Sequence, residues 1–559
     1  MTMPLSNGGC EGTYKAVSGT GLSGSIADGW RDDTAYSPQS IRIFSMSTDT
    51  HEGLCAQSVE LRTDHGAAQL RHDLDWTPTE DREYTVSLWL KGKSATDEPM
   101  RLEIGLQHTS PMYAMYLSRI VRVTDHWTRY TFSGMAGGAP VALILRTNVR
   151  GTFLVDNAKI TSAPATIPGL PAAPVQRNAI GMHVNKADIP GVLMEHMGVR
   201  RLWDTYAGGW ASAEPARGVY DWTKLDSTVA EAQKHGIELI YTFGITPPWA
   251  SARPSEHSVY GDGNIAEPAN VEDLRAFASA LSSRYRGRIR AYEIWNEANE
   301  PTFFSGTPEK LVEMAQAVYE GVKSGDPHAL VLSANITGQG SAGYLDYYLS
   351  LGGDRYADII SAHVYANVNS SAPEPEASRF TIYNIRKVIA KYPRVRNKPI
   401  WDTEQNWQND TSAWGKEGMA PDDVAAAYIA RSLILNWRYG YVRIIIDGWD
   451  YFSYFGIYLS VHGDANKPSA AGQAYISAHD WMTGNRMTSE GYSGSATWFE
   501  LTRPNGKKTY VVWNAAGQDK FAIPSTWAID RRQDLDGATA VIGKERNISI
   551  GPRPILLLP

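Results

Sequence analysis

The sequence has little of several features that would place it in other classes of protein. Only two of its 559 residues are cysteine, Cys10 and Cys55. These two could pair, but disulfide bonds are too few to be the main source of stability. No apolar stretch approaches the roughly 20 residues needed to span a bilayer. Residues 1–9 lack the basic start and apolar run of a signal peptide.

Basic clusters and cofactor-binding motifs are missing too. The formal net charge is −7 and the sequence pI is about 6.0, without the clustered Lys and Arg that nucleic acid requires. Neither a P-loop nor a GxGxxG after a strand is present. The 13 histidines are scattered, and the two cysteines lie too far apart for a zinc-binding CxxC pair. The sequence therefore predicts no nucleic-acid partner, no cofactor and no metal site.

Short apolar segments alternate with amphipathic ones between residues 177 and 483. Residues 274–285, for example, carry apolar side chains at helical spacing before Gly287. Candidate strands lie at 179–180, 199–202, 237–243, 289–295, 329–333, 359–364, 399–403 and 441–446. Strands that alternate with helices indicate a parallel sheet covered by helices. Eight such units predict an α/β protein with a (β/α)8 TIM barrel.

Two of these candidate strands run into glutamates. Residues 292–297 read YEIWNE and residues 398–404 read KPIWDTE, so Glu297 closes the fourth strand and Glu404 the seventh. Reacting groups in such barrels lie at the C-terminal ends of the strands. Both carboxyl groups are therefore expected to face one pocket. A pair of carboxyl groups is the smallest set of side chains that most glycosidases use to cleave a glycosidic bond.

This arrangement resembles the retaining glycoside hydrolases of clan A. There the acid/base glutamate follows an asparagine at the end of strand four, and the nucleophile ends strand seven. Further strings resemble glycoside hydrolase family 39 and its relatives that cleave bacterial exopolysaccharides: RLWD at 201–204, EPARGVYDW at 214–222, PPWA at 247–250 and SAHVY at 361–365. The resemblance covers roughly residues 178–482. It departs at Ala298, where the family usually has proline.

A retaining mechanism needs one protonated carboxyl group and one carboxylate, so their environments must differ. We expect Glu297 to be the acid/base, with a pKa raised by apolar neighbours such as Trp295. Glu404 is then the nucleophile, kept anionic by donors such as Arg201 and Tyr365. The carboxyl groups of a retaining pair lie about 5–5.5 Å apart.

Other polar residues are candidates for substrate binding. The resemblance implies that Asn296 donates to the sugar 2-hydroxyl. His363 is expected to donate near the nucleophile or the sugar, although it could also be a structural histidine beneath the site. His183, at the end of the first strand, has the same two interpretations. Arg201 could equally be half of a buried ion pair.

Aromatic residues are abundant, with 18 Trp and 29 Tyr. Many lie near predicted strand ends, where their rings would stack on the apolar faces of sugars. We expect Trp249 and Trp449 to lie in the cleft. The alternative is that these indoles fill the barrel core.

The two ends of the chain have the pattern of β domains. Alternating apolar residues at 84–90 and 102–106 predict a β-sandwich over residues 1–163. It resembles jelly-roll carbohydrate-binding modules, although such sandwiches also serve as scaffolds. A Pro-rich linker follows at 164–176. Residues 484–559 predict a small supporting β-sandwich, with a hairpin at Asn505-Gly506 and a final strand at 548–558.

The sequence thus predicts a retaining O-glycoside hydrolase that acts on a polysaccharide or oligosaccharide. Two alternatives remain open: a non-catalytic carbohydrate-binding protein, and a transglycosylase that uses the same residues. The sugar, the linkage, endo or exo action and the oligomeric state are not specified. Because polysaccharides are extracellular, we expect a periplasmic or secreted protein whose leader is missing here, with a cytoplasmic location as the alternative.

Overall fold

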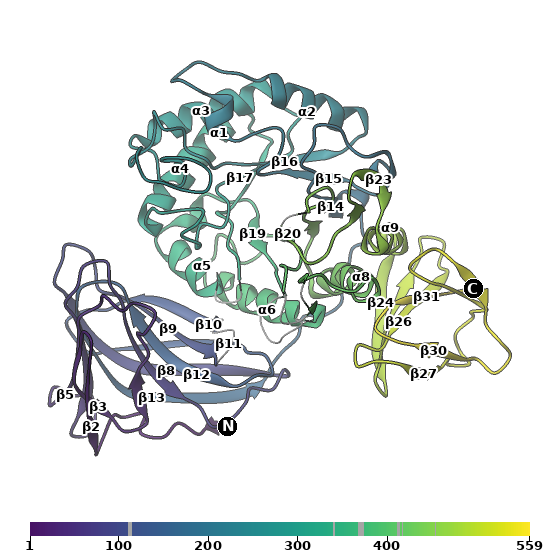
Figure 1. Ribbon diagram of the computed structural model, residues 1–559. Coiled ribbons are helices and arrows are strands. Elements are labelled where there is room, and N and C mark those ends of the chain that lie inside the picture. The colour runs from purple at the N-terminus through teal and green to yellow at the C-terminus, as the bar shows by residue number, and fades with distance from the viewer. Residues whose placement is uncertain (110–114, 339–340, 367–373, 411–413, 416, 453) are drawn as a thin grey trace.

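A parallel β-barrel lies between two mainly antiparallel β parts (Figure 1). The computed structural model describes residues 1–109, 115–338, 341–366, 374–410, 414–415, 417–452 and 454–559. Among the helices in these ranges, none is long and apolar enough to cross a membrane.

The barrel has the eight strands that the sequence predicts. They are β14 (Ile180–Met182), β15 (Val199–Leu202), β16 (Glu238–Thr242), β17 (Ala291–Glu293), β18 (Leu330–Leu332), β19 (Ile360–His363), β20 (Ile400–Gln405) and β21 (Arg443–Ile446). Parallel pairing runs in the order β18-β17-β16-β15-β14-β21-β20-β19. A parallel bridge between Leu332 and Ile359 joins the two ends of this sheet. The TIM barrel is therefore confirmed.

Helices connect the strands and cover the barrel. They are α1 (Trp210–Ala213), α2 (Thr223–Lys234), α3 (Val271–Arg284), α4 (Pro308–Gly325), α5 (Ser341–Ser350), α6 (Ser378–Ile389), α8 (Asp422–Tyr439) and α9 (Ala470–Met482). Local signals fix their starts: the Thr307 side chain accepts a hydrogen bond from the Lys310 amide, with Pro308 as the first helical residue. Asn270 caps α3 in the same way.

The barrel interior is built in layers, because side chains alternate between the two faces of a strand. One layer is apolar and draws on seven strands or their starts: Val199, Ile240, Ala291, Leu332, Ile359, Trp401 and Ile445. Two residues further along the same strands the side chains are polar and buried: Arg201, Thr242, Glu293, Ser361 and Thr403. The polar layer thus lies directly above the apolar layer in the barrel interior.

The alternation is broken in strand β20. Its register against β21 shifts between Asp402 and Gln405, and against β19 it shifts after Asp402. A bulge of this kind adds a residue and re-aims side chains. Consequently Thr403 and Glu404, although adjacent, both form hydrogen bonds inside the barrel.

The N-terminal part is a two-sheet β-sandwich. One sheet has the order β11-β8-β13-β6-β5-β3-β2 with β1 paired to β13, and the other has the order β10-β9-β12-β7-β4. Its strands are β1 (Thr2–Met3), β2 (Tyr14–Gly19), β3 (Leu22–Ala27), β4 (Trp30–Asp32), β5 (Arg42–Ser47), β6 (Ala56–Leu61), β7 (Ala68–Asp73), β8 (Arg82–Ser94), β9 (Arg101–His108), β10 (Met115–Arg122), β11 (Thr128–Met135), β12 (Val141–Thr147) and β13 (Gly151–Pro164). Cys10 and Cys55 are free thiols.

This sandwich packs on the barrel through helices α5 and α6, next to which β10 and β11 lie in Figure 1. The Asn384 side chain of α6 donates to the carbonyls of Tyr116 and Met135 at 3.2 and 3.1 Å and accepts from the Met135 amide at 2.8 Å. At Gly343 of α5, an added Cβ would lie 2.7 Å from the Ser118 carbonyl oxygen. Only glycine permits this close approach.

The C-terminal part is a six-stranded sheet with a two-stranded sheet beside it. After β22 (Ser460–Val461) and β23 (Asp464–Pro468), its strands are β24 (Arg486–Ser493), β25 (Ala496–Thr502), β26 (Lys508–Trp513), β27 (Asp519–Ala522), β28 (Arg531–Gln533), β29 (Thr539–Val541), β30 (Asn547–Ile550) and β31 (Ile555–Leu558). The predicted single strand at 548–558 is wrong: Pro552 and Pro554 separate β30 from β31, because proline lacks the N–H that a strand needs. The division into domains at residues 163, 176 and 483 stays a prediction.

Candidate active site

Glu297 lies four residues beyond the end of β17, in a turn held on several sides. The Asn335 amide donates to the Trp295 carbonyl at 3.2 Å, and the Ala298 amide donates to the Asn335 carbonyl at 3.0 Å. The buried Trp295 indole donates to the Phe303 carbonyl at 3.0 Å. Glu297 itself has a φ of 40°, an uncommon conformation for a residue other than glycine. Strained backbone of this kind is concentrated at functional sites.

Glu404 is held by two donors. Arg201 Nη1 donates to Glu404 Oε2 at 2.7 Å, and the Tyr365 hydroxyl donates to Glu404 Oε1 at 2.5 Å. The pKa of Tyr365 is raised, first by burial and then by Glu404, so its hydroxyl keeps the proton that it donates. The bulge in β20 is what brings Glu404 to these partners.

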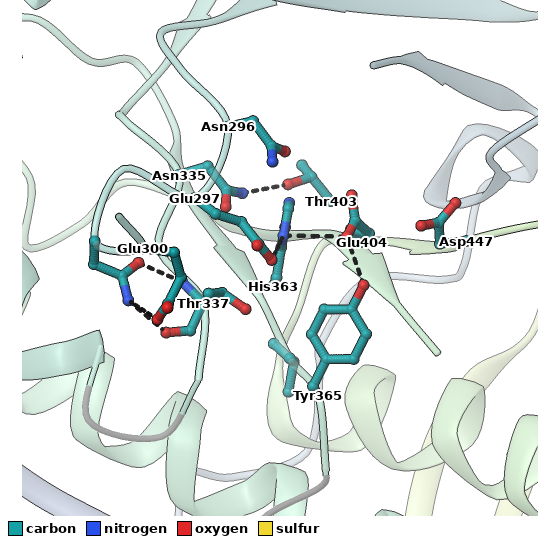
Figure 2. A network of polar contacts seen from close by, with 12 residues as sticks. Asn296, Glu297, Glu300, Asn335, Thr337, His363, Tyr365, Thr403, Glu404 and Asp447 are labelled. Carbon is teal, nitrogen blue, oxygen red and sulfur yellow. Dashed lines mark hydrogen bonds and ion pairs between the residues drawn. The ribbon is translucent and has the colours of Figure 1, made fainter. Parts of the chain in front are cut away.

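The two carboxyl groups lie close together (Figure 2). His363 stands beside both, with Nδ1 2.7 Å from Glu297 Oε1 and 3.5 Å from Glu404 Oε1. One oxygen atom of each carboxyl group and a His363 nitrogen all lie within 4.8 Å of one another. Burial lowers the pKa of His363 to about 4, so the imidazole is neutral at pH 7.

Arg201 connects this pair to the polar layer beneath. Besides Glu404, its guanidinium donates to Glu293 Oε2 at 2.8 Å and to Asn296 Oδ1 at 2.7 Å. Burial alone would raise the pKa of Glu293, but Arg201 and further donors lower it to about 2. The Thr242 and Thr403 hydroxyls are among these donors, each at 2.8 Å. Glu293 is therefore a permanent anion that orients Arg201.

The environments of the two glutamates differ in the way that acid/base chemistry requires. Burial raises the pKa of Glu297 to about 7. Burial raises the pKa of Glu404 too, while the positive charge of Arg201 opposes the change. Since Arg201 and Tyr365 both donate to Glu404, we assign the first negative charge of the pair to Glu404.

The pair opens into a cavity of about 1100 Å³. Of the predicted binding residues, His183, Asn296 and Tyr365 line it, whereas Arg201 and His363 lie beneath it, fully buried. His183 forms an ion pair with Asp447. Burial acts to lower the pKa of His183, but Asp447 outweighs burial and raises it. The sugar contacts expected of these residues stay predictions.

The structure corrects the placement of both tryptophans. Trp449 is 0% exposed and donates to the Ala465 carbonyl at 2.8 Å, so no face of its indole is open to a sugar. Trp249 lies outside the cavity lining, packed edge-on against Trp210 with its N–H on the Glu214 carbonyl at 2.9 Å. Trp449 thus belongs to the core, as the alternative interpretation had it, whereas Trp249 is half-buried and packs against the core.

Other aromatic residues line the cavity instead: Trp203, Tyr260, Phe303, Tyr451, Tyr454 and Phe455. Tyr451 and Tyr454 follow the eighth predicted strand, in the kind of position where aromatic residues were expected, whereas the sequence analysis did not identify the first three as cavity residues. Tyr260 and Phe303 come from long loops, where no periodicity marks the side that faces the ligand. Trp203 directly follows β15, within the RLWD string, which is the one signal that could have indicated it.

Acidic groups outnumber basic ones around the cavity. Asp204, Glu300 and Asp447 line it together with the two central glutamates. Burial raises the pKa of Glu300 to about 6. The Asn299 side-chain amide donates to Glu300 Oε1 at 3.1 Å and to the Thr337 carbonyl at 3.0 Å, which fixes the loop after Glu297.

Three groups in the described part of the chain could hold a metal ion by proximity alone: His183, Glu404 and Asp447; Glu297, His363 and Glu404; and His196, His479 and Asp480. Hydrogen bonds or ion pairs within each group account for its spacing. The guanidinium of Arg201 already supplies a fixed positive charge next to Glu404.

No protein-family model matches the chain, and no curated protein matches it. Solved structures do. A family 39 glycoside hydrolase from the gut symbiont Bacteroides cellulosilyticus is similar with a TM-score of 0.53 and 19% identity, over 84% of this chain and 97% of that one. The chain shares the fold of this enzyme. The resemblance to family 39 is thus confirmed for the fold.

Two further structures have lower scores. A glucosidase from Croceicoccus marinus has a TM-score of 0.49 and 12% identity, over 70% of this chain and 96% of its own. A GH39 enzyme from Xanthomonas axonopodis pv. citri has a TM-score of 0.46 and 15% identity, over 70% of this chain and 97% of its own.

Proposed function

We propose that the protein is a retaining O-glycoside hydrolase, with Glu297 as the acid/base and Glu404 as the nucleophile. The observation that carries the proposal is the placement of these carboxyl groups, with one oxygen of each within 4.8 Å. Retaining enzymes have carboxyl groups about 5–5.5 Å apart, whereas inverting enzymes leave room for a water at about 6.5–9.5 Å. The fold shared with a family 39 glycoside hydrolase supports the same reaction.

The reaction has two displacements. Glu404 attacks the anomeric carbon while Glu297 gives its proton to the leaving oxygen, so the glycosidic bond breaks and a glycosyl ester forms on Glu404. Glu297, now a carboxylate, takes a proton from water, and the water oxygen displaces Glu404 from the anomeric carbon. Glu297 suits both steps because its pKa of about 7 lies near the working pH.

The surrounding residues position the reacting groups. Arg201 and Tyr365 hold Glu404 in its anionic form and fix the oxygen that attacks. Asn296, whose Oδ1 accepts from Arg201, keeps its NH2 group for the sugar 2-hydroxyl. His363 is a positioning residue for Glu297. The substrate is a polysaccharide or oligosaccharide, such as a bacterial exopolysaccharide or hemicellulose, and the place of action is the periplasm or the exterior.

The test uses activated aryl glycosides together with the polymers. Wild type should release the aglycone from at least one 2,4-dinitrophenyl glycoside and give a product of retained configuration by NMR. Glu404→Ala should lose this activity by at least about 10⁴-fold, and azide should restore it with inverted product. Glu195→Ala is the matched control, since Glu195 is exposed and outside the cavity. Inverted product from wild type, or near wild-type rates for Glu404→Ala, would refute the assignment.

A further inference from the structure

The N-terminal sandwich contributes to the cavity of the proposed active site. Glu103 on β9, Ile120 on β10 and Arg146 on β12 line this cavity together with Glu297 and Glu404. All three belong to the sheet β10-β9-β12-β7-β4. One wall of the cavity is therefore supplied from outside the barrel.

A second cavity of about 830 Å³ continues from the same three residues along the seam between sandwich and barrel. Tyr36 and Arg101 line its sandwich side, and Pro308 and Tyr347 line its barrel side. Glu103, Ile120 and Arg146 border both cavities, so the two adjoin at these residues. We call the two cavities together the path; it extends from the paired carboxyl groups to Tyr36, which is 56% exposed.

The seam is held in one geometry near this path. Arg122 of β10 pairs with Glu309 of α4 at 2.7 Å and donates to the Tyr347 hydroxyl of α5 at 2.9 Å. The bonds of Asn384 and the close approach at Gly343 fix the sandwich further along. A wall anchored in this way can hold a ligand in register with the barrel, because little freedom is lost on binding.

The charges along the path disfavour acidic sugars. Arg146 pairs with Glu103, Arg101 pairs with Glu98 at 3.0 Å, and Arg150 pairs with Asp64 at 3.3 Å. Each arginine that lines the second cavity is thus already neutralised by a carboxylate. At the other end the path is acidic, as described above. Acidic sugars would meet repulsion and find no free cation in the described lining.

We propose that the sandwich sheet is the second wall of the substrate cleft, and that it holds uncharged sugar units of the polymer remote from the bond being cut. Tyr36 is the stacking platform at the far end. This inference rests on the proposed function and deepens it, since it assigns the sandwich to the same substrate chain that the glutamates cleave. The sandwich then acts within the cleft and not as a separately tethered binding module.

The test compares short and long substrates. Tyr36→Ala should leave kcat/KM for an aryl monoglycoside within about twofold of wild type and lower kcat/KM for the matching polymer about tenfold, the loss expected for one stacking contact. Ile120→Trp, which fills the junction, should lower polymer turnover more strongly. Tyr492→Ala is the matched control, because Tyr492 is 75% exposed in the C-terminal part. Equal effects of Tyr36→Ala on both substrates, or none, would overturn the proposal.

A binding experiment distinguishes the proposed cleft wall from the proposed catalytic function. Neutral oligosaccharides from mannan, xylan and galactan, and an acidic polyuronate, are titrated calorimetrically into wild type and Tyr36→Ala. The best neutral oligosaccharide should bind about tenfold more weakly to Tyr36→Ala, whether or not it is cleaved. Lack of turnover by wild type would contradict only the assignment of Glu297 and Glu404 as catalytic residues. Unchanged affinity for Tyr36→Ala, no binding by wild type, or tighter binding of the polyuronate would count against the cleft wall.

Discussion

Replacing Glu297 with glutamine should stabilise the protein at alkaline pH although it removes the proposed acid. In the native state the pKa of Glu297 is about 7, against an ordinary value of 4.5. Below pH 4.5 this carboxyl group is protonated in both states, so its burial carries no ionic penalty. As the pH rises through 7, the unfolded state has already lost the proton, and the native state must either retain it or bury a charge.

The magnitude follows from the size of the shift. A difference of one pKa unit corresponds to about 1.4 kcal/mol. The free energy of unfolding of wild type should therefore fall by about 3 kcal/mol between pH 4.5 and pH 8 through Glu297 alone. Glutamine is neutral throughout and avoids this loss. The free energy of unfolding of Glu297→Gln should therefore rise relative to that of wild type by about 3 kcal/mol between pH 4.5 and pH 8.

Urea unfolding at a series of pH values measures the effect, with hydrogen exchange of strand β17 reporting on the barrel itself. Such a local probe is needed because a chain with several β parts need not unfold in one step. Glu195→Gln serves as the control, since its side chain is exposed and should give no pH-dependent difference. Parallel stability curves for wild type and Glu297→Gln from pH 4.5 to 8 would refute the raised pKa and the burial argument behind it.

Three other results are expected. Activity of wild type on substrates with poor leaving groups should fall above pH 7 as Glu297 loses its proton, and a pH–rate profile without this limb would contradict its role as the acid. Arg201→Ala should destabilise the protein by about 3–5 kcal/mol in urea unfolding, because Glu293 and Glu404 stay buried without their cation; a loss below about 1 kcal/mol would contradict that pairing. Tyr451→Ala should raise KM for oligosaccharides severalfold with little change in the urea midpoint. Trp449→Ala should instead lower the midpoint by the equivalent of about 3–5 kcal/mol. The reverse pattern would show that Trp449 contacts the substrate.

The order of the barrel strands could be predicted from the sequence because the required signals are local. Apolar runs of the right length, glycines after helices and the spacing between them identify eight strands without any tertiary information. The same count places Glu297 just beyond strand four and Glu404 on strand seven. What it does not give is the direction of a side chain within an irregular strand. With Trp401 inside the barrel, simple alternation points Glu404 outward, and only the bulge after Asp402 reverses this.

The roles of the tryptophans depend on packing that a sequence does not encode locally. An indole suits a barrel core and a sugar-binding surface equally well, and the difference lies in where its N–H finds an acceptor. For Trp449 the acceptor is the Ala465 carbonyl, sixteen residues away in a neighbouring segment. Glu293 was missed for a related reason. Its importance comes from side chains on four other strands, β15, β16, β19 and β20, that form hydrogen bonds to it, and no motif records such a convergence.

The seam between sandwich and barrel also bears on how such a protein can change during evolution. A binding module on a flexible tether can be exchanged among enzymes by recombination, since neither partner depends on the shape of the other. Here Asn384 and Gly343 are fitted to the backbone of β10 and β11. An exchange of the sandwich would also have to carry α5 and α6, which belong to the barrel. The two parts are therefore expected to be inherited together, and relatives that keep the sandwich should keep glycine at position 343.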